Sequence, residues 1–249
     1  MSSSTLPNSY TFQPIGIIES PYQEKFGVPR QANLVAAKSR IRLLAPYNTP
    51  DALQGLTEFS HLWLHFVFHL CLRQTWKPKV RPPRLGGNQS LGVFATRSSF
   101  RPNPIGLSLV RLESIHTDQQ DIYIEIRGAD LVAGTPILDI KPYLPYADIQ
   151  PQAHAATWAQ EAPDPLNVHW TPEALANLQV VEEMQNLYEL ITQVLAQDPR
   201  PAYHHKTDPH RVYGVKLSGY NVNFCYRNSE QAPFGAPRPC IWVLAIKPL

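Results

Sequence analysis

The most regular hydrophobic pattern in the chain lies at residues 59–70, FSHLWLHFVFHL. From His61 to Leu70 every second side chain is apolar, while the alternate positions carry three histidines, a tryptophan and a valine. A period of two is typical of a β-strand with one buried face, so we expect a strand over this segment. The side chains expected on its buried face are Leu62, Leu64, Phe66, Phe68 and Leu70.

Other strand-like segments follow one another at short intervals through the first 146 residues. They lie at residues 10–20, 40–44, 107–115, 121–127 and within 131–146, with a helix-like turn at 51–56. Strands separated by so little helix predict a closed or strongly bent β-sheet. No GxGxxG follows a strand, and no P-loop, GxSxG or HExxH is present, so the commonest cofactor and hydrolase signatures are missing.

The pattern changes at residues 147–169, which are rich in alanine, proline and glutamine. We place a domain boundary there and expect domains at 1–165 and 166–249. Thr171-Pro172 is typical of a helix start, and the apolar positions that follow, up to Val194, predict a single helix of roughly 25 residues. A hairpin turning at Ser218-Gly219 and a last strand at 240–247 complete a small α+β unit.

Composition favours a soluble globular protein. The 249 residues are 43% hydrophobic and 17% charged, which does not suggest widespread disorder. Cys71, Cys225 and Cys240 are scattered and odd in number, so they fit neither a disulfide framework nor a metal-binding pair and indicate a reducing compartment. No apolar run approaches the ~20 residues of a membrane span, and no signal-peptide pattern opens the chain. We therefore expect a cytoplasmic protein without a membrane partner.

Positive charge is concentrated in one segment although the net charge is only +2. Residues 70–106 contain no acid, and their basic residues are Arg73, Lys77, Lys79, Arg81, Arg84, Arg97 and Arg101. Such a segment can attract a polyanion or a carboxylate. The alternative is a solvated basic face.

The loop at residues 92–108, GVFATRSSFRPNPIGLS, is the strongest candidate site. Pro102 and Pro104 fix φ and push the residues before them, Arg101 and Asn103, toward extended conformations. A stiff loop that presents guanidinium groups, with Arg97 nearby, suits an anion or a planar polar ligand. A rigid strand connection with solvated arginines is the alternative.

Similar chemistry recurs in three other places. Pro29 stiffens the approach to Arg30 and Gln31, and DPRPAYHH near residue 200 again holds an arginine between prolines. There we expect Arg200, Tyr203, His204, His205 and Lys206 to be exposed and to suit RNA contact, with a polar turn as the alternative. Asp139, Lys141 and Tyr143 share one parity of a short strand, which places an acid, a base and a phenol side by side or forms only a structural ion pair beside a core tyrosine.

Histidines at positions 61, 65 and 69 raise the possibility of a metal site. In a strand they spread over ~26 Å at about 3.3 Å per residue, too far apart for one ion. We therefore expect no metal, and we expect His69 at the strand end to be the one that meets a ligand.

Six segments, in order and nearly end to end, resemble the bacterial TsaA-like (TrmO) family. They are SPYQEKFGVPRQ, FSHLW with FVFH, RPPRLGGN, GVFATRSSFRPNPIGLSLV, DLVAGTPILDIKPYLPY and DPRPAY. The resemblance implies an S-adenosylmethionine-dependent methyltransferase that acts on N6 of threonylcarbamoyl-adenosine at position 37 of tRNA, beside the anticodon. It also implies an α+β protein with an N-terminal β-barrel-like, non-Rossmann catalytic domain, a tRNA anticodon arm as partner, and a homodimer with the cofactor site at or near the subunit interface.

The resemblance also implies roles for individual residues. The expected cofactor-binding residues are Pro29, Arg30, Gln31, His69, Leu70, Arg97, Leu107, Asp130 and Leu131. The expected catalytic wall is Asp139, Lys141 and Tyr143, and the expected substrate contacts are Arg101, Asn103, Arg200 and Tyr203. Where the family favours an aspartate before Gly-Thr-Pro, this chain has Ala133, so no catalytic role can depend on an acid there.

Two other functions remain open from the sequence. One is an RNA- or nucleotide-binding module that retains the S-adenosylmethionine pocket without turnover. The other is a methyltransferase that acts on another anionic small molecule.

Overall fold

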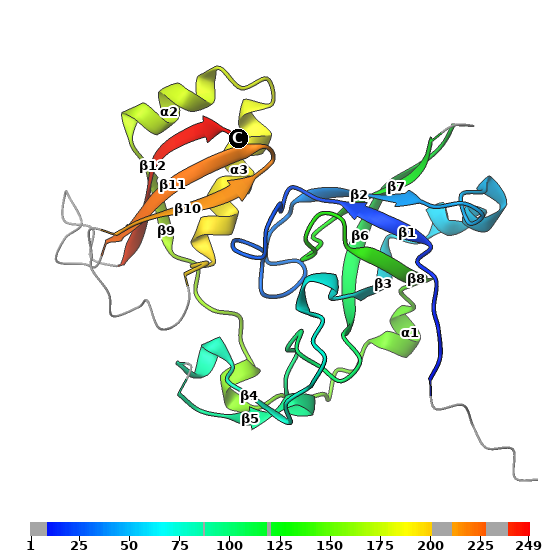
Figure 1. Ribbon diagram of the computed structural model, residues 1–249. Helices are drawn as coiled ribbons and strands as arrows, with labels where there is room; N and C mark the ends of the chain where they lie inside the picture. Colours follow the sequence, from blue (N-terminus) through cyan, green and yellow to red (C-terminus); the bar gives the residue numbers. More distant parts are fainter. Residues whose placement is uncertain (1–8, 87, 119–120, 201–210, 228–238) are drawn as a thin grey trace, which may run out of the picture.

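Six antiparallel strands close into a barrel in the N-terminal part of the computed structural model, which describes residues 9–86, 88–118, 121–200, 211–227 and 239–249 (Figure 1). Around the barrel the strand order is β1-β2-β7-β6-β3-β8. The bounds are β1 Gly16–Glu19, β2 Lys38–Leu43, β3 His61–Val67, β6 Ile105–Asp118, β7 Asp121–Arg127 and β8 Pro136–Pro142. The barrel closes because β1 pairs with both β2 and β8. The predicted strand-built N-terminal body is confirmed.

The interior of the barrel is filled by the alternate apolar side chains of its strands. Leu62, Leu64 and Phe66 on β3 are buried there, as the alternation predicts. The expectation for Leu70 is wrong, because the strand ends at Val67 and the chain turns into the 3-10 turn His69–Cys71, which leaves Leu70 exposed. The turn is fixed where the Phe68 amide donates to the carbonyl oxygen of Pro104 at 2.8 Å.

Residues 71–104 form an excursion between β3 and β6. It contains the two-stranded sheet of β4 Lys79–Val80 and β5 Leu91–Gly92 and the 3-10 turns Pro83–Leu85 and Val93–Ala95. Further 3-10 turns lie at Pro50–Leu53, Leu56–Glu58 and Thr157–Ala159, and a one-turn helix α1 at Pro145–Asp148. The excursion meets the interdomain connector where Arg84 Nη2 donates to the carbonyl oxygen of Glu161 at 2.6 Å.

A four-stranded sheet with two helices forms the C-terminal part (Figure 1). The order is β10-β11-β12-β9, with β10 Val212–Leu217, β11 Tyr220–Arg227 and β12 Cys240–Pro248 antiparallel and β9 Asn167–Trp170 parallel to β12. The predicted hairpin is confirmed, and Ser218 and Gly219 both have positive φ, 48° and 82°, as a two-residue hairpin turn requires. β9 is absent from the sequence-based expectation.

The single long helix expected after Thr171 is wrong. The structure has α2 Pro172–Gln179 and α3 Met184–Ala196, and α2 begins as expected with the Thr171 hydroxyl accepting from the Ala174 amide at 3.1 Å. Two β-branched residues and two adjacent carboxylates separate the helices, and Val180 there is 87% exposed. The break lets α2 pack on β12 and α3 on β9.

A segment before the barrel's second strand packs on the C-terminal sheet. Tyr22, Val35 and Ala37 belong to the same buried cluster as the sheet and its helices, and Tyr22 forms a β-bridge with Leu217. The Ser218 amide donates to the carbonyl oxygen of Pro21 at 2.9 Å. The loop with Arg30 and Gln31 is therefore held between the two parts of the chain, and the division at residue 165 stays a prediction.

Candidate functional site

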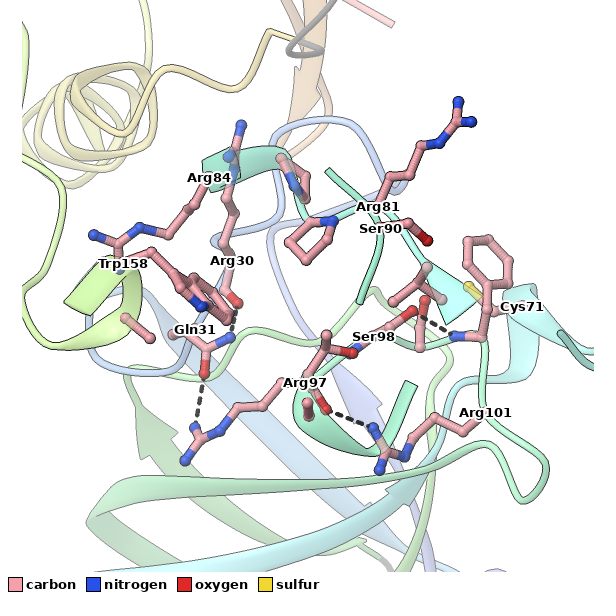
Figure 2. A pocket seen from close by; sticks show the side chains of 18 of the residues that line it. Arg30, Gln31, Cys71, Arg81, Arg84, Ser90, Arg97, Ser98, Arg101 and Trp158 are labelled. Carbon is pink, nitrogen blue, oxygen red and sulfur yellow. Dashed lines mark hydrogen bonds between the residues drawn. The ribbon is translucent and has the colours of Figure 1, made fainter. Parts of the chain in front are cut away.

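A pocket of about 2050 Å³ lies between the β1–β2 loop, the excursion, the connector before β9 and the end of α3 (Figure 2). Its walls come from residues 30–34, 71–102, 155–166 and 196–200. The basic residues that line it are Arg30, Arg73, Lys77, Lys79, Arg81, Arg84, Arg97, Arg101 and Arg200, and the acidic ones are Asp164 and Asp198. A concave surface with this excess of positive charge concentrates the field that attracts phosphates.

Three residues predicted as cofactor ligands form a connected row in this pocket (Figure 2). Arg97 Nη1 donates to Gln31 Oε1 at 2.7 Å, and Gln31 Nε2 donates to the carbonyl oxygen of Arg30. Arg30 Nη2 reaches the carbonyl oxygen of Arg200 at 3.5 Å. Buried Pro29 precedes the row and fixes its backbone. The two proline-stiffened loops predicted from the sequence therefore meet, although 66 residues separate Gln31 from Arg97.

Asp130 lies beside this row, just after β7. Its Oδ1 accepts from the Ser108 hydroxyl at 2.5 Å. Desolvation by the surrounding protein raises the pKa of Asp130, while the hydrogen bonds from Ser108 and the Ala32 amide and the positive charge of Arg97 partly offset that effect. Leu131 is buried, and its carbonyl oxygen accepts from Ser20 Oγ at 2.7 Å. A carboxyl group in this setting gains from a cationic or hydroxyl-bearing ligand.

Leu107 and the expected catalytic wall share the outer face of the barrel. In the sheet register Leu107 on β6 pairs with His65 on β3, and His65 pairs with Asp139 on β8, so the three stand in one row across adjacent strands. Strand spacing places the ends of that row roughly 10 Å apart. The register shifts at His65 and Phe66, and such bulges are common beside functional sites.

The three residues of the expected catalytic wall have different contacts. Lys141 Nζ lies 2.9 Å from Asp139 Oδ2, and both side chains are at least half exposed. Asp139 Oδ1 accepts from the Ile140 amide at 2.9 Å. The Tyr143 ring lies 6.2 Å from the Trp63 ring. The structure thus contains the ion pair that the sequence offered as a structural alternative, whereas Tyr143 is only partly buried and is not a core tyrosine.

The remaining candidates, His69, Leu70, Arg101 and Asn103, lie at the two ends of the excursion. Desolvation lowers the pKa of His69, so its imidazole is neutral at pH 7. Lys25 Nζ donates to the carbonyl oxygen of Leu70 at 3.3 Å. Arg101 Nη1 donates to the carbonyl oxygens of Thr96 at 2.8 Å and Val93 at 3.4 Å, and Asn103 is exposed.

The expected exposure of Arg200 is wrong. Its side chain is buried with a residue exposure of 4%, and Nε and Nη2 contact the two carboxylate oxygens of Asp198 at 2.7 and 2.8 Å. Its guanidinium also lies 3.5 Å above the Tyr226 ring. The sequence cannot reveal this stacking, because Tyr226 follows 26 residues later on another strand. Tyr203 and His204 to Lys206 lie outside the described residues.

The pocket brings together some of the predicted site residues. Arg30, Gln31, Arg97, Arg101 and Arg200 line it, whereas Pro29, His69, Leu70, Asn103, Leu107, Asp130, Leu131, Asp139, Lys141 and Tyr143 are not part of its lining. Sequence reasoning missed Ser108, although its place on the buried parity between Gly106 and Val110 is a visible signal. It also missed the pocket residue Trp158, whose proline- and alanine-rich surroundings give no such signal.

Two further searches cover only the part of the chain that the structure describes. No group of three or more His, Cys, Asp or Glu side chains there is placed to hold a metal ion. No helix there has the length and apolar character needed to cross a membrane.

These features define a β-barrel protein of non-Rossmann type with a basic pocket between two parts of the chain. The chain belongs to the TrmO family: residues 17–149 match the model of the tRNA-methyltransferase O N-terminal domain, and residues 163–232 match the TrmO C-terminal domain. The resemblance inferred from the sequence motifs is confirmed.

Several known proteins are similar to this chain in sequence or structure over nearly its whole length. An Escherichia coli K12 protein named tRNA (adenine(37)-N6)-methyltransferase is 49% identical over 220 residues, 87% of this chain and 93% of that one. A Pseudomonas aeruginosa protein named as a putative S-adenosylmethionine-dependent methyltransferase is 48% identical over 224 residues, 88% of this chain and 93% of that one. The crystal structure of TrmO from Pseudomonas aeruginosa superposes with a TM-score of 0.75 at 37% identity, covering 99% of this chain and all of that one.

Proposed function

We propose that this protein transfers a methyl group from S-adenosylmethionine to N6 of threonylcarbamoyl-adenosine at position 37 of tRNA, in the cytoplasm. The observation that carries the proposal is the basic pocket whose inner row, Arg30, Gln31 and Arg97, lies beside Asp130. The names of the Escherichia coli and Pseudomonas aeruginosa relatives support the reaction and the cofactor.

The residues around Asp130 suit S-adenosylmethionine. This cofactor supplies an electrophilic methyl group on a sulfonium, together with an ammonium, a carboxylate and a ribose. Asp130 has the acceptor oxygens for the cationic or hydroxyl groups, and Arg30 and Arg97 have donors for the carboxylate. We also assign to the cofactor site, outside the lining of the basic pocket, the imidazole of His69, the exposed side chain of Leu107 and the backbone at Pro29, Leu70 and Leu131.

The chain's own contribution is alignment and control of one proton. N6 is a weak nucleophile, so holding it in line with the methyl carbon and excluding water provide most of the acceleration that the protein can offer. N6 becomes acidic as its new bond forms, and an acceptor can then take a hydrogen bond from it. Asp139 and Tyr143 are our candidates, with Lys141 fixing Asp139 through their 2.9 Å ion pair.

We assign Arg101 to the threonyl carboxylate of the substrate. Its Nη1 holds the carbonyl oxygens of Val93 and Thr96, which orients the guanidinium, and its other nitrogens can bind a carboxylate in the pocket. Asn103 lies two residues further along the same loop and is the expected neighbouring contact. Because Arg200 is buried, we assign it to holding the pocket wall and not to the tRNA. The exposed cations of the pocket are then our candidates for binding the tRNA phosphates.

The test uses labelled S-adenosylmethionine and an anticodon stem-loop with either threonylcarbamoyl-adenosine or adenosine at position 37. Wild type should methylate the modified stem-loop, and Arg101→Ala should lose far more activity on the modified base than on adenosine. Arg111→Ala is the control, because Arg111 is exposed and lies outside the pocket. Within the described residues its ion pair is with Glu113. Equal losses on both substrates would remove the role of Arg101, and no transfer by wild type would remove the proposed reaction.

The outer face of the barrel supports a homodimer as part of this proposal. Ile105 and Leu107 expose apolar surface beside the row that ends at Asp139. A second copy that covers this face would shield the reaction from water. Light scattering should give a dimer for wild type and a monomer for Ile105→Asp; a monomeric wild type with full activity would dispose of the dimer.

A further inference from the structure

Three aromatic side chains in the basic pocket are exposed instead of packing into a core. Phe94 is 74% exposed, Trp76 is 51% exposed, and Phe100 is also exposed. The Trp76 and Phe94 ring centroids lie 6.4 Å apart, with their planes tilted by 31°. Large aromatic rings are costly to leave in water, and neither buried cluster of the chain contains these three. Their exposed faces are therefore a feature that the barrel and the methyl-transfer site do not explain.

Guanidinium groups accompany two of these rings. The Arg73 Cζ lies 3.8 Å from the Phe100 ring centroid, and the Arg101 Cζ lies 5.9 Å from the Phe94 ring centroid. Cation–π contacts of this kind hold an arginine in a fixed direction without using its hydrogen-bond donors. We call Arg73, Trp76, Phe94, Phe100 and Arg101 the aromatic platform.

The surroundings of the aromatic platform select the kind of ligand. All five residues line the same pocket as Lys77, Lys79 and Arg81, and residues 70–106 contain no acid. The cations attract phosphates, whereas the exposed rings need flat apolar partners. Single-stranded RNA offers both together, because its unstacked bases can lie on aromatic rings while its backbone follows the positive groove. A regular duplex keeps its base faces covered.

We propose that the aromatic platform stacks unpaired anticodon-loop bases that flank adenine 37, and so splays the loop to present N6 to the methyl donor. This inference rests on the proposed function, since an exocyclic amine within a stacked loop is accessible only after its neighbours separate. It assigns substrate recognition to Trp76 and Phe94, which carry no charge and take no part in the methyl transfer itself.

The test compares the full-length wild type with Phe94→Leu and with the double variant Trp76→Leu/Phe94→Leu. Leucine keeps apolar bulk and removes the ring face. The matched control is Phe12→Leu, because Phe12 is 65% exposed and lies outside the pocket. Each protein is titrated with an anticodon stem-loop RNA and with a blunt RNA duplex of the same phosphate number, and melting temperature shows that each is folded.

The expected result is specific to the unpaired loop. Stem-loop affinity should fall about 5- to 150-fold for each stacked base that is lost, the range measured for base–aromatic stacking. Duplex affinity and the salt dependence of binding should stay within about twofold, because the phosphate contacts remain. Phe12→Leu should bind both RNAs as wild type does.

Two results would overturn the aromatic platform. One is unchanged stem-loop affinity in Phe94→Leu and in the double variant, and the other is an equal loss on stem-loop and duplex. A methyl-transfer assay on wild type separates this proposal from the proposed function. Transfer without any platform effect removes only the platform, whereas a platform effect on binding without transfer removes only the reaction.

Discussion

Gly106 leaves room for the Phe66 ring of the neighbouring strand beside the candidate site, and its replacement gives a sharp test of the fold. It pairs with Phe66 across β3 and β6. A Cβ added at Gly106 would overlap three atoms of the Phe66 ring, and all three approaches are closer than any van der Waals contact allows. Phe66 is buried and its ring packs edge-on against Phe68 at 5.1 Å, so it has little room to move. Gly106→Ala should therefore cost about 1–3 kcal/mol of the free energy of unfolding, as overpacked cores do.

The assay is urea unfolding of four proteins: wild type, Gly106→Ala, Phe66→Leu and the double variant. Leucine at position 66 lacks the atoms that the new methyl would meet, so the double variant should lose at least about 1 kcal/mol less than the sum of the single losses. Gly92→Ala is the control, because a Cβ there meets nothing within 4 Å and φ is −58°, and it should be neutral or slightly stabilising. Additive losses in the double variant, or a neutral Gly106→Ala, would refute the close approach.

Three further predictions concern charged side chains. The raised pKa of Asp130 means that the folded protein binds more protons than the unfolded chain above about pH 4, the ordinary aspartate range. The free energy of unfolding of wild type minus that of Asp130→Asn should therefore decrease as the pH rises from about 4 to the raised pKa of folded Asp130. Urea titrations in which this difference increases with pH would contradict the prediction. Arg200→Ala should destabilise by about 3 kcal/mol, the low end for breaking a buried pair, because Asp198 keeps some exposure. A cost below about 1 kcal/mol in the same assay would show that the pair is solvated. Asp139→Ala should change stability by less than about 1 kcal/mol, since its pair with Lys141 is exposed. It should nevertheless lower the turnover number without weakening cofactor binding, and unchanged turnover would exclude Asp139 as the proton acceptor.

The barrel could be predicted from the sequence wherever burial follows one face of a strand. The alternation on β3 is clear because Leu62, Leu64 and Phe66 fill the barrel while histidines and Trp63 face outward. β9 could not be found in this way, because its four residues lie in a proline- and alanine-rich stretch and its parallel partner, β12, begins 73 residues later. A strand whose pairing depends on such a distant segment has no local signal.

The helix error has a local cause that periodicity hides. Apolar residues recur every three or four positions from Leu175 to Val194, so the spacing between neighbours favours a single helix. The buried residues Leu178 and Leu187, however, are nine positions apart, which would place them on opposite faces of one helix. The break at Val180 separates two packing directions, because α2 packs on β12 and α3 packs on β9.

The sequence predicts which side chains the loops of the candidate site carry, but not how those side chains are arranged in space. Proline spacing indicates that Arg30 and Arg97 are held in stiff loops, but their meeting through Gln31 depends on how the chain folds. The same limit explains Arg200, for which proline-flanked arginine chemistry suggested exposure while Asp198 and Tyr226 enclose the side chain. Local sequence fixes which groups a loop offers, and tertiary packing decides which of them reach the pocket.

The most direct test of the central claim is mass spectrometry of anticodon-loop nucleosides. tRNA would be taken from cells that lack this protein and from the same cells supplied with wild type or with Asp130→Asn. We expect N6-methylated threonylcarbamoyl-adenosine at position 37 to be absent without this protein, abundant with wild type and strongly reduced with Asp130→Asn. The same level of that nucleoside in all three samples would contradict the proposed reaction.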